Sequence, residues 1–167
     1  AEVVRNAYNE QLAERWEPPS DNSVFRLGIL GHGIDRGSWL WLLKTLACLQ
    51  KQVEDLSGRI EIFQVGQADR SQMHLDLREQ NLKCGLTVSG HLSRSKTYDV
   101  LNQTHAVYLG MSQPEGMQFV PGRVYDLLAS GRPIISNADP TSEIARIITS
   151  TGNGRCYRSA DVDRASA

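Results

Sequence analysis

The sequence predicts an α/β fold, a Rossmann-like doubly wound parallel sheet. Short apolar runs alternate along the chain with longer stretches of helical spacing. The runs are partly continuous rather than strictly alternating, as in strands that are buried on both faces. No hairpin signal joins one run to the next, so consecutive strands are expected to pair in parallel through right-handed helical crossovers.

Five segments are expected to form the strands, each rich in aliphatic residues and bounded by glycine, proline or polar residues. They are FRLGIL (25–30), RIEIFQV (59–65), LTVS (86–89), HAVYL (105–109) and RPIIS (132–136). In open sheets of this kind, ligands bind at the carboxyl ends of the strands. Function is therefore expected in the loops that follow these ends, at 31–38, 66–70, 90–95, 110–122 and 137–141.

Five helices are expected between and after these strands. Ser38 is expected to cap the first, in which Trp39 begins an apolar stripe that Trp41 does not join. The second covers 70–82, Ser93 or Ser95 caps the third, and the fourth carries Val124, Leu127 and Leu128. The fifth is expected to start with Asp139 as its cap and Pro140 at its first position.

Length and composition fit one globular domain. The chain has 167 residues, of which 40% are hydrophobic, enough to form a core at this size. Its 18 basic and 19 acidic residues nearly cancel, which speaks against a nucleic-acid-binding surface. No apolar run reaches the roughly 18–20 residues of a membrane span. Three scattered cysteines support neither a metal site nor a disulfide framework, so a reducing cytoplasm is the simplest compartment.

The chain is expected to divide into a lead-in, residues 1–24, and one domain, residues 25–167. The lead-in closes with the turn-rich stretch EPPSDNS and has no signal-peptide pattern. The polar last residues, DVDRASA, have no core face. We therefore expect that this domain was cut out of a longer polypeptide and that another domain precedes it.

The loop after the first strand carries the residues Gly31-His32-Gly33-Ile34-Asp35-Arg36-Gly37-Ser38. Glycines let a backbone approach a phosphate closely, and a helix that starts here would add its positive end. Arg36 and His32 would add charge. The same loop also fits a tight turn whose glycines only supply positive φ angles, and the residues alone do not choose between the two.

A second segment, PGRVYDLLASGRPII (121–135), places Asp126 near the start of a helix that follows a strand-end loop. A carboxylate can accept two hydrogen bonds from the adjacent hydroxyls of a ribose. An acid in the first turns of a helix is also common on ordinary solvated helices. Taken alone, the pattern favours this ordinary interpretation.

The same segment, followed by SEIARIITSTGNG, resembles the C-terminal domain of GT-B glycosyltransferases. The likeness is greatest to the retaining family 4, or group 1, enzymes of bacterial surface-polysaccharide synthesis. Their nucleotide-sugar helix reads Lys/Arg-x-x-Glu-Tyr-Leu-Ala-x-Gly-x-Pro. The matching positions are Arg123, Asp126, Leu128, Ala129, Gly131 and Pro133. The segments VVRNAYN, RLGILGHGIDRG and LTVSGHLSRSKTYDVLNQTHAVYLG resemble other parts of the domain in order, so the likeness covers nearly the whole chain.

The resemblance implies a donor-binding domain for a nucleoside-diphosphate sugar, with catalytic roles for Arg36 and Asp126. Asp126 would accept the ribose hydroxyls, and Arg36 would stabilise the departing diphosphate. This requires Arg36 and the helix that bears Asp126 to face one cleft. Further donor contacts would come from the residues at the strand ends and in the loop before this helix. They are Gly31, His32, Gly33, Gly90, His91, Gln118, Phe119, Val120 and Arg123.

In the intact enzyme, a hexosyltransferase, the sugar would pass to a glycan or lipid-linked acceptor held by an N-terminal domain outside this chain. The fragment would bind the donor without turnover, and no metal or other cofactor is expected. The resemblance fits a cytoplasmic enzyme, with a peripheral place at the inner membrane face.

The sequence departs from the family pattern at two positions that keep another class of function open. Family members often carry two glutamates, whereas this chain has Gln118 and the shorter acid Asp126. A non-catalytic or degenerate nucleotide-binding module is therefore the alternative. An epimerase of similar architecture ranks last, because no acid and base pair for that chemistry is evident.

Overall fold

The computed structural model describes residues 19–21, 23–31, 34–111 and 120–165. One sheet of six parallel strands runs through these residues, in the order β3-β2-β1-β4-β5-β6. The strands are β1 (Phe25–Leu30), β2 (Ile60–Val65), β3 (Gly85–Val88), β4 (Ala106–Leu109), β5 (Ile134–Ser136) and β6 (Gly154–Cys156). The predicted doubly wound parallel sheet is thereby confirmed.

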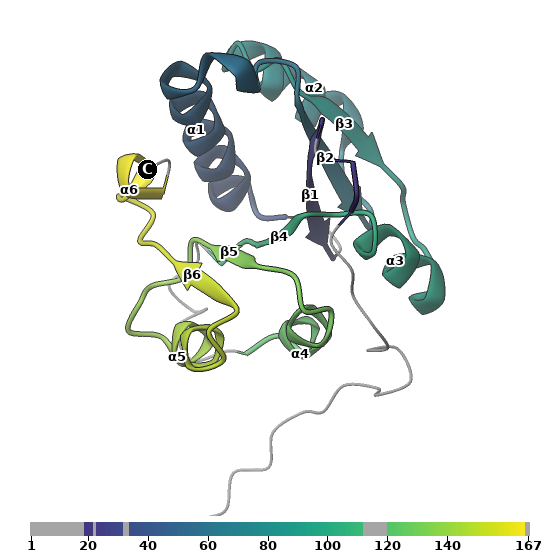
Figure 1. The fold of residues 1–167 in the computed structure, drawn as a ribbon, viewed down its shortest axis with the longest axis vertical. Helices are drawn as coiled ribbons and strands as arrows, with labels where there is room; N and C mark the ends of the chain where they lie inside the picture. Colours follow the sequence, from purple (N-terminus) through teal and green to yellow (C-terminus); the bar gives the residue numbers. More distant parts are fainter. Residues whose placement is uncertain (1–18, 22, 32–33, 112–119, 166–167) are drawn as a thin grey trace, which may run out of the picture.

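The helices lie on both sides of this sheet (Figure 1). They are α1 (Arg36–Gln52), α2 (Arg70–Glu79), α3 (Arg94–Leu101), α4 (Arg123–Ala129), α5 (Glu143–Ser150) and α6 (Val162–Ala165), with a short 3-10 turn, η2 (Glu54–Leu56). No helix among the described residues is long and apolar enough to cross a membrane.

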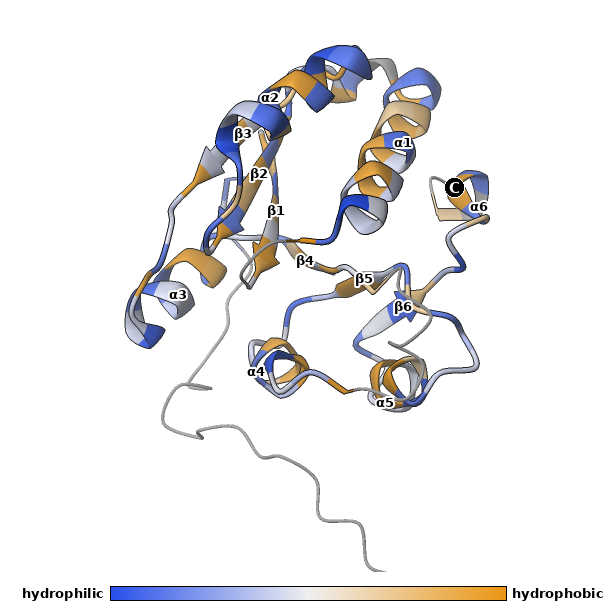
Figure 2. Ribbon diagram, turned by 180° about the vertical axis from the view of Figure 1, so that it is seen from behind, coloured by the Kyte–Doolittle hydropathy of each residue, from blue (hydrophilic) through white to orange (hydrophobic). Residues whose placement is uncertain are grey.

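Two hydrophobic cores form because side chains of one strand point alternately to opposite faces. In β4, Ala106 and Tyr108 join the core under α1 and α2, whereas Val107 and Leu109 join the core under α3, α4 and α5. In Figure 2 the ribbon of α1 changes between hydrophobic and hydrophilic residues within its turns, as expected for an amphipathic helix with one face toward the core. Both faces of the central strands are therefore covered.

Two helix starts differ from the prediction. Asp35 caps α1 and accepts a hydrogen bond from the Ser38 amide at 2.8 Å, while Ser38 itself is buried inside the helix. Ser142, not Asp139, caps α5, since Asp139 closes a turn just before it by accepting from the Thr141 amide. Ser93 caps α3 as one of the two predicted alternatives. Several short polar residues near a helix start offer the same capping chemistry, so the sequence leaves the choice open.

Two further features were missed. Strand β6 has only three residues, and its polar centre, Arg155, gives no apolar run to detect. Trp41, placed off the apolar stripe, is in fact 4% exposed and stacks on Tyr108 with ring centroids 5.9 Å apart. The stripe of α1 is wider than predicted because β4 and the segment around Tyr157 both pack against it.

Candidate functional site

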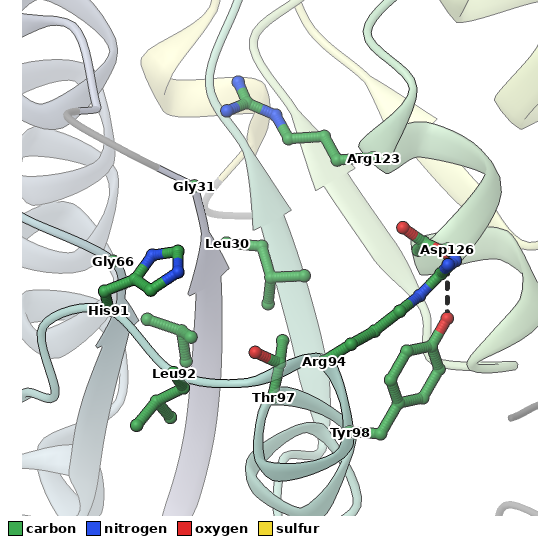
Figure 3. A pocket seen from close by; sticks show the side chains of 11 residues that line it. Leu30, Gly31, Gly66, His91, Leu92, Arg94, Thr97, Tyr98, Arg123 and Asp126 are labelled. Carbon is green, nitrogen blue, oxygen red and sulfur yellow. Dashed lines mark hydrogen bonds and ion pairs between the residues drawn. The ribbon is translucent and has the colours of Figure 1, made fainter.

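A pocket of about 250 Å³ opens at the carboxyl ends of β1 and β2 (Figure 3). The strand ends form its floor, the loop after β3 closes one side, and α3 and α4 supply its polar groups. Its lining consists of Leu30, Gly31, Val65, Gly66, His91, Leu92, Arg94, Thr97, Tyr98, Arg123 and Asp126. This is the edge of the sheet at which doubly wound folds bind ligands.

One end of the pocket is built by Gly31 and Arg123. The Arg123 guanidinium lies over Gly31, and a Cβ atom at position 31 would collide with its Nη1. Gly31 has a φ of 119°, which side chains rarely adopt, so both the backbone conformation and the close approach require glycine here. The glycine at the end of β1 therefore leaves room for the Arg123 guanidinium of α4 to lie over the strand ends.

The Arg123 guanidinium is incompletely paired. Its Nε atom is buried and has no hydrogen-bond partner among the described residues. Burial lowers the pKa of Arg123, and the negative charge of nearby Asp35 opposes that shift. The Arg123 guanidinium nevertheless places a cationic group at this end of the pocket, which favours an anion there.

The opposite end is built around Asp126. Its Oδ1 accepts hydrogen bonds from Arg94 Nη2 at 2.6 Å and from the Tyr98 hydroxyl at 2.9 Å. Figure 3 shows these two side chains reaching from α3 toward Asp126 on α4, while Arg123 points away from it. The carboxylate holds the pKa of Arg94 above its usual range, and burial raises the pKa of Tyr98.

The loop after β3 is tied to the end of β2. The Gly66 amide donates to the Gly90 carbonyl at 2.9 Å, and Gly90 has a φ of 68°. This turn brings the exposed side chain of His91 to the rim of the pocket, although Gly90 itself is not part of the lining.

The structure does not bring Arg36 into this pocket, contrary to the sequence-based prediction. Its guanidinium pairs instead with both carboxylate oxygens of Asp76 on α2. Trp39 Nε1 and Gln72 Nε2 donate to the same carboxylate, at 2.8 Å and 2.9 Å. Hydrogen bonding by Arg36 lowers the pKa of Asp76. A fully buried carboxylate needs a cation, and Asp76 directs Arg36 away from the strand ends.

The remaining predicted residues have three different outcomes. His32, Gly33, Gln118 and Phe119 lie outside the described residues. Val120 is half-buried against the core formed by α4 and α5, and it does not line the pocket. Gly31, His91, Arg123 and Asp126 are therefore the predicted residues that the structure gathers in one place.

Sequence reasoning missed the polar residues that α3 contributes, above all Arg94 and Tyr98. Their spacing of four residues, directly after the cap Ser93, places both on one face of a helix that starts at a strand-end loop. That signal was present in the sequence. Among the described residues, no group of three or more His, Cys, Asp or Glu side chains is arranged to hold a metal ion.

Comparison with known proteins adds evidence at the level of the fold. No protein-family model and no curated protein matches the sequence. WaaG, a glycosyltransferase involved in lipopolysaccharide biosynthesis, aligns with a TM-score of 0.67 and 14% identity over 87% of this chain and 37% of its own. A mutant of Staphylococcus aureus TarM, in complex with fondaparinux, α-GlcNAc-glycerol and UDP, is a second similar structure. It aligns with a TM-score of 0.61 and 13% identity over 90% of this chain and 29% of its own.

A third structure is the C-terminal domain of a glycosyl transferase group 1 family protein, LpcC from Francisella tularensis. It aligns with a TM-score of 0.65 and 11% identity over 96% of this chain and 84% of that domain. The chain thus spans about a third of WaaG and of TarM, but most of the isolated LpcC domain. It has the Rossmann-like α/β fold of one domain of the GT-B glycosyltransferases.

Proposed function

We propose that this chain is the donor-binding domain of a glycosyltransferase and that the pocket between α3 and α4 holds a nucleoside-diphosphate sugar. The observation that carries the proposal is the arrangement of opposite chemistries at the two ends of this pocket. An incompletely paired guanidinium lies at one end and a carboxylate at the other, with an apolar floor between them. A nucleoside diphosphate has matching parts in the same order.

The diphosphate would lie against Arg123. Its oxygens accept hydrogen bonds, and the Arg123 guanidinium that lines the pocket would donate them. The pocket carries two guanidinium groups, on Arg94 and Arg123, against the single carboxylate of Asp126. Because Arg94 is paired with Asp126, the Arg123 guanidinium is the lining cation that would attract an anionic ligand. It would also stabilise the charge that grows on the diphosphate when the bond to the sugar breaks.

The nucleoside would extend from the diphosphate along the apolar floor. Its ribose would donate hydroxyl protons to Asp126. The base would lie toward the loop after β3, where Leu92 and His91 line the pocket. Arg123 thus takes the place that the sequence analysis gave to Arg36, and no bound metal ion is required for the step.

Transfer itself would need groups outside this chain. In this proposal an N-terminal domain holds a glycan or lipid-linked acceptor, and this domain alone binds the donor without turnover. This chain spans only 37% of WaaG and 29% of TarM. The family resemblance supports a hexosyltransferase of bacterial polysaccharide synthesis in the cytoplasm.

A thermal-shift panel of UDP, GDP, ADP, TDP and CMP tests the proposal. A ligand at ~100 times its Kd adds about 2.7 kcal/mol to the stability of the protein, which is readily measured. We expect at least one nucleoside diphosphate to raise the melting temperature, and Arg123→Met to reduce the stabilisation to about a third at the same ligand concentration. No response to any of the nucleotides would contradict donor binding. A full-length protein that binds nucleotide but never consumes donor would instead establish the degenerate alternative.

A further inference from the structure

We propose that Arg94 and Tyr98 are positioning residues that orient Asp126 so that the pocket selects ribonucleotides over 2′-deoxyribonucleotides. This inference rests on the proposed function and identifies the ribose as the part of the ligand that the α3 end of the pocket recognises. It is drawn from three features of this end: the oxygen that the two donors reach, their different burial, and their origin on another helix.

Both donors from α3 reach the same carboxylate oxygen. Arg94 Nη2 and the Tyr98 hydroxyl donate to Oδ1 of Asp126, at 2.6 Å and 2.9 Å. Among the described residues, no hydrogen bond reaches Oδ2. A carboxylate can accept about four hydrogen bonds. Asp126 is therefore anchored through one oxygen and keeps the other as an acceptor in the pocket that it lines.

The two donors contribute differently. Tyr98 is 7% exposed, so its ring is fixed by the core and its hydroxyl has a defined position. The Arg94 side chain is 54% exposed and supplies a compensating charge at the rim. Burial and the neighbouring carboxylate raise the pKa of Tyr98, which keeps its hydroxyl protonated and able to donate. Tyr98 thus sets the geometry, while Arg94 stabilises the ionised carboxylate.

The link also joins two elements that are far apart in the sequence. Asp126 lies in the first turn of α4, and its partners lie 28 and 32 residues earlier on α3. An aspartate is a short side chain, so an acceptor on it reaches a ligand only if the carboxylate is held at the pocket wall. The two hydrogen bonds from α3 to Oδ1 provide that constraint. An aspartate without partners on a second helix would lack it.

The chemical consequence is a preference for a ligand with two adjacent hydroxyl donors. A site built to pair with a hydroxyl discriminates against the analogue that lacks it, because its polar groups are left unpaired. This rim is half-exposed and water can partly replace the missing donor, so we expect a moderate preference. The ribose form should bind about 10-fold more tightly than the 2′-deoxy form.

The test is isothermal titration of the chain with the ribose and 2′-deoxy forms of UDP, GDP and ADP. For the base that binds best, the wild type should show the 10-fold ratio of affinities, and Tyr98→Phe and Arg94→Gln should reduce it to about 2-fold. Arg94→Lys should restore part of the ratio, because it returns the charge. Lys96→Gln is the matched control: it removes an exposed cation of α3 outside the pocket and should leave the ratio unchanged.

Inorganic pyrophosphate separates positioning from a general loss of the site. It carries no ribose, so Tyr98→Phe should leave its affinity unchanged. A wild-type ratio near one, or a ratio that Tyr98→Phe and Arg94→Gln do not alter, would overturn this inference while nucleotide binding itself stands. If none of the nucleoside diphosphates binds, the proposed function fails and this inference with it.

Discussion

Among the described residues, two aspartate–arginine pairs link one helix to another, and they differ in how many hydrogen bonds the carboxylate can still accept. Asp76 is fully buried, and Arg36, Trp39 and Gln72 donate to both of its oxygens. The Asp126 side chain is 28% exposed, and its partners Arg94 and Tyr98 use only Oδ1. The first pair is saturated and fastens α1 to α2. The second keeps an acceptor and lines a pocket, so the same chemistry serves structure in one place and a candidate site in the other.

Substitution at the saturated pair should affect stability and leave binding alone. Asp76→Ala removes the acceptor of three donors, among them the buried indole N–H of Trp39. Hydrogen bonds to a charged group contribute about 1.5–3 kcal/mol, so we expect the free energy of unfolding to fall by about 3 kcal/mol. Urea denaturation measures the loss. An unchanged stability would show that the pair does not fasten the two helices.

The pH dependence of stability should report on the same carboxylate. Hydrogen bonding by Arg36 lowers the pKa of Asp76 below its ordinary value of 3.8. A group with a depressed pKa makes its full contribution to the free energy of unfolding above that ordinary value. The contribution is lost as the pH falls toward the pKa of the folded state. Wild-type stability should therefore decline below about pH 4, and Asp76→Asn should show a shallower decline in urea titrations. Parallel declines would contradict the assignment.

Substitution of Arg123 should have the opposite effects to substitution of Asp76: weaker nucleotide binding without a loss of stability. We expect Arg123→Met to weaken nucleoside diphosphate binding about 30-fold, or about 2 kcal/mol, in isothermal titration. Its folded stability should be equal to or higher than that of the wild type, because a buried Nε without a partner is removed. A large loss of stability with unchanged affinity would make Arg123 a structural residue and would move the diphosphate elsewhere.

Arg36→Gln should have the smallest effect on nucleotide binding, and it separates the sequence-based hypothesis from the structural one. Arg36 lies outside the pocket, so nucleotide affinity should stay within about 2-fold of the wild type. The variant leaves the fully buried Asp76 carboxylate without its cation, so the stability loss should be at least as large as that of Asp76→Ala. A loss of nucleotide binding that matches Arg123→Met would restore Arg36 to the diphosphate site.

The fold was largely predictable because its signals are local. Apolar runs fix β1 to β5, and the absence of hairpin signals fixes their parallel pairing. Strand β6 gave no such signal, since it consists of a glycine, an exposed arginine and a half-buried cysteine. Strand β6 forms by pairing with β5, and this contact between distant segments cannot be predicted from a short stretch of sequence.

The site was predictable in its place but not in all its members. The carboxyl edge of the sheet follows from the order of strands and helices, and it does gather Gly31, Arg123 and Asp126. The direction of Arg36 does not follow, because its partner Asp76 lies 40 residues away on another helix. The spacing of Arg94 and Tyr98 places them on one helix face, but their contact with Asp126 spans 28 residues or more and does not follow from that spacing.

A crystal structure of this chain with the nucleoside diphosphate that stabilises it most would test donor binding most directly. We expect diphosphate oxygens within hydrogen-bond distance of the Arg123 guanidinium and ribose hydroxyls at Asp126 Oδ2. A nucleotide whose diphosphate contacts Arg36, or that binds outside the pocket between α3 and α4, would contradict it.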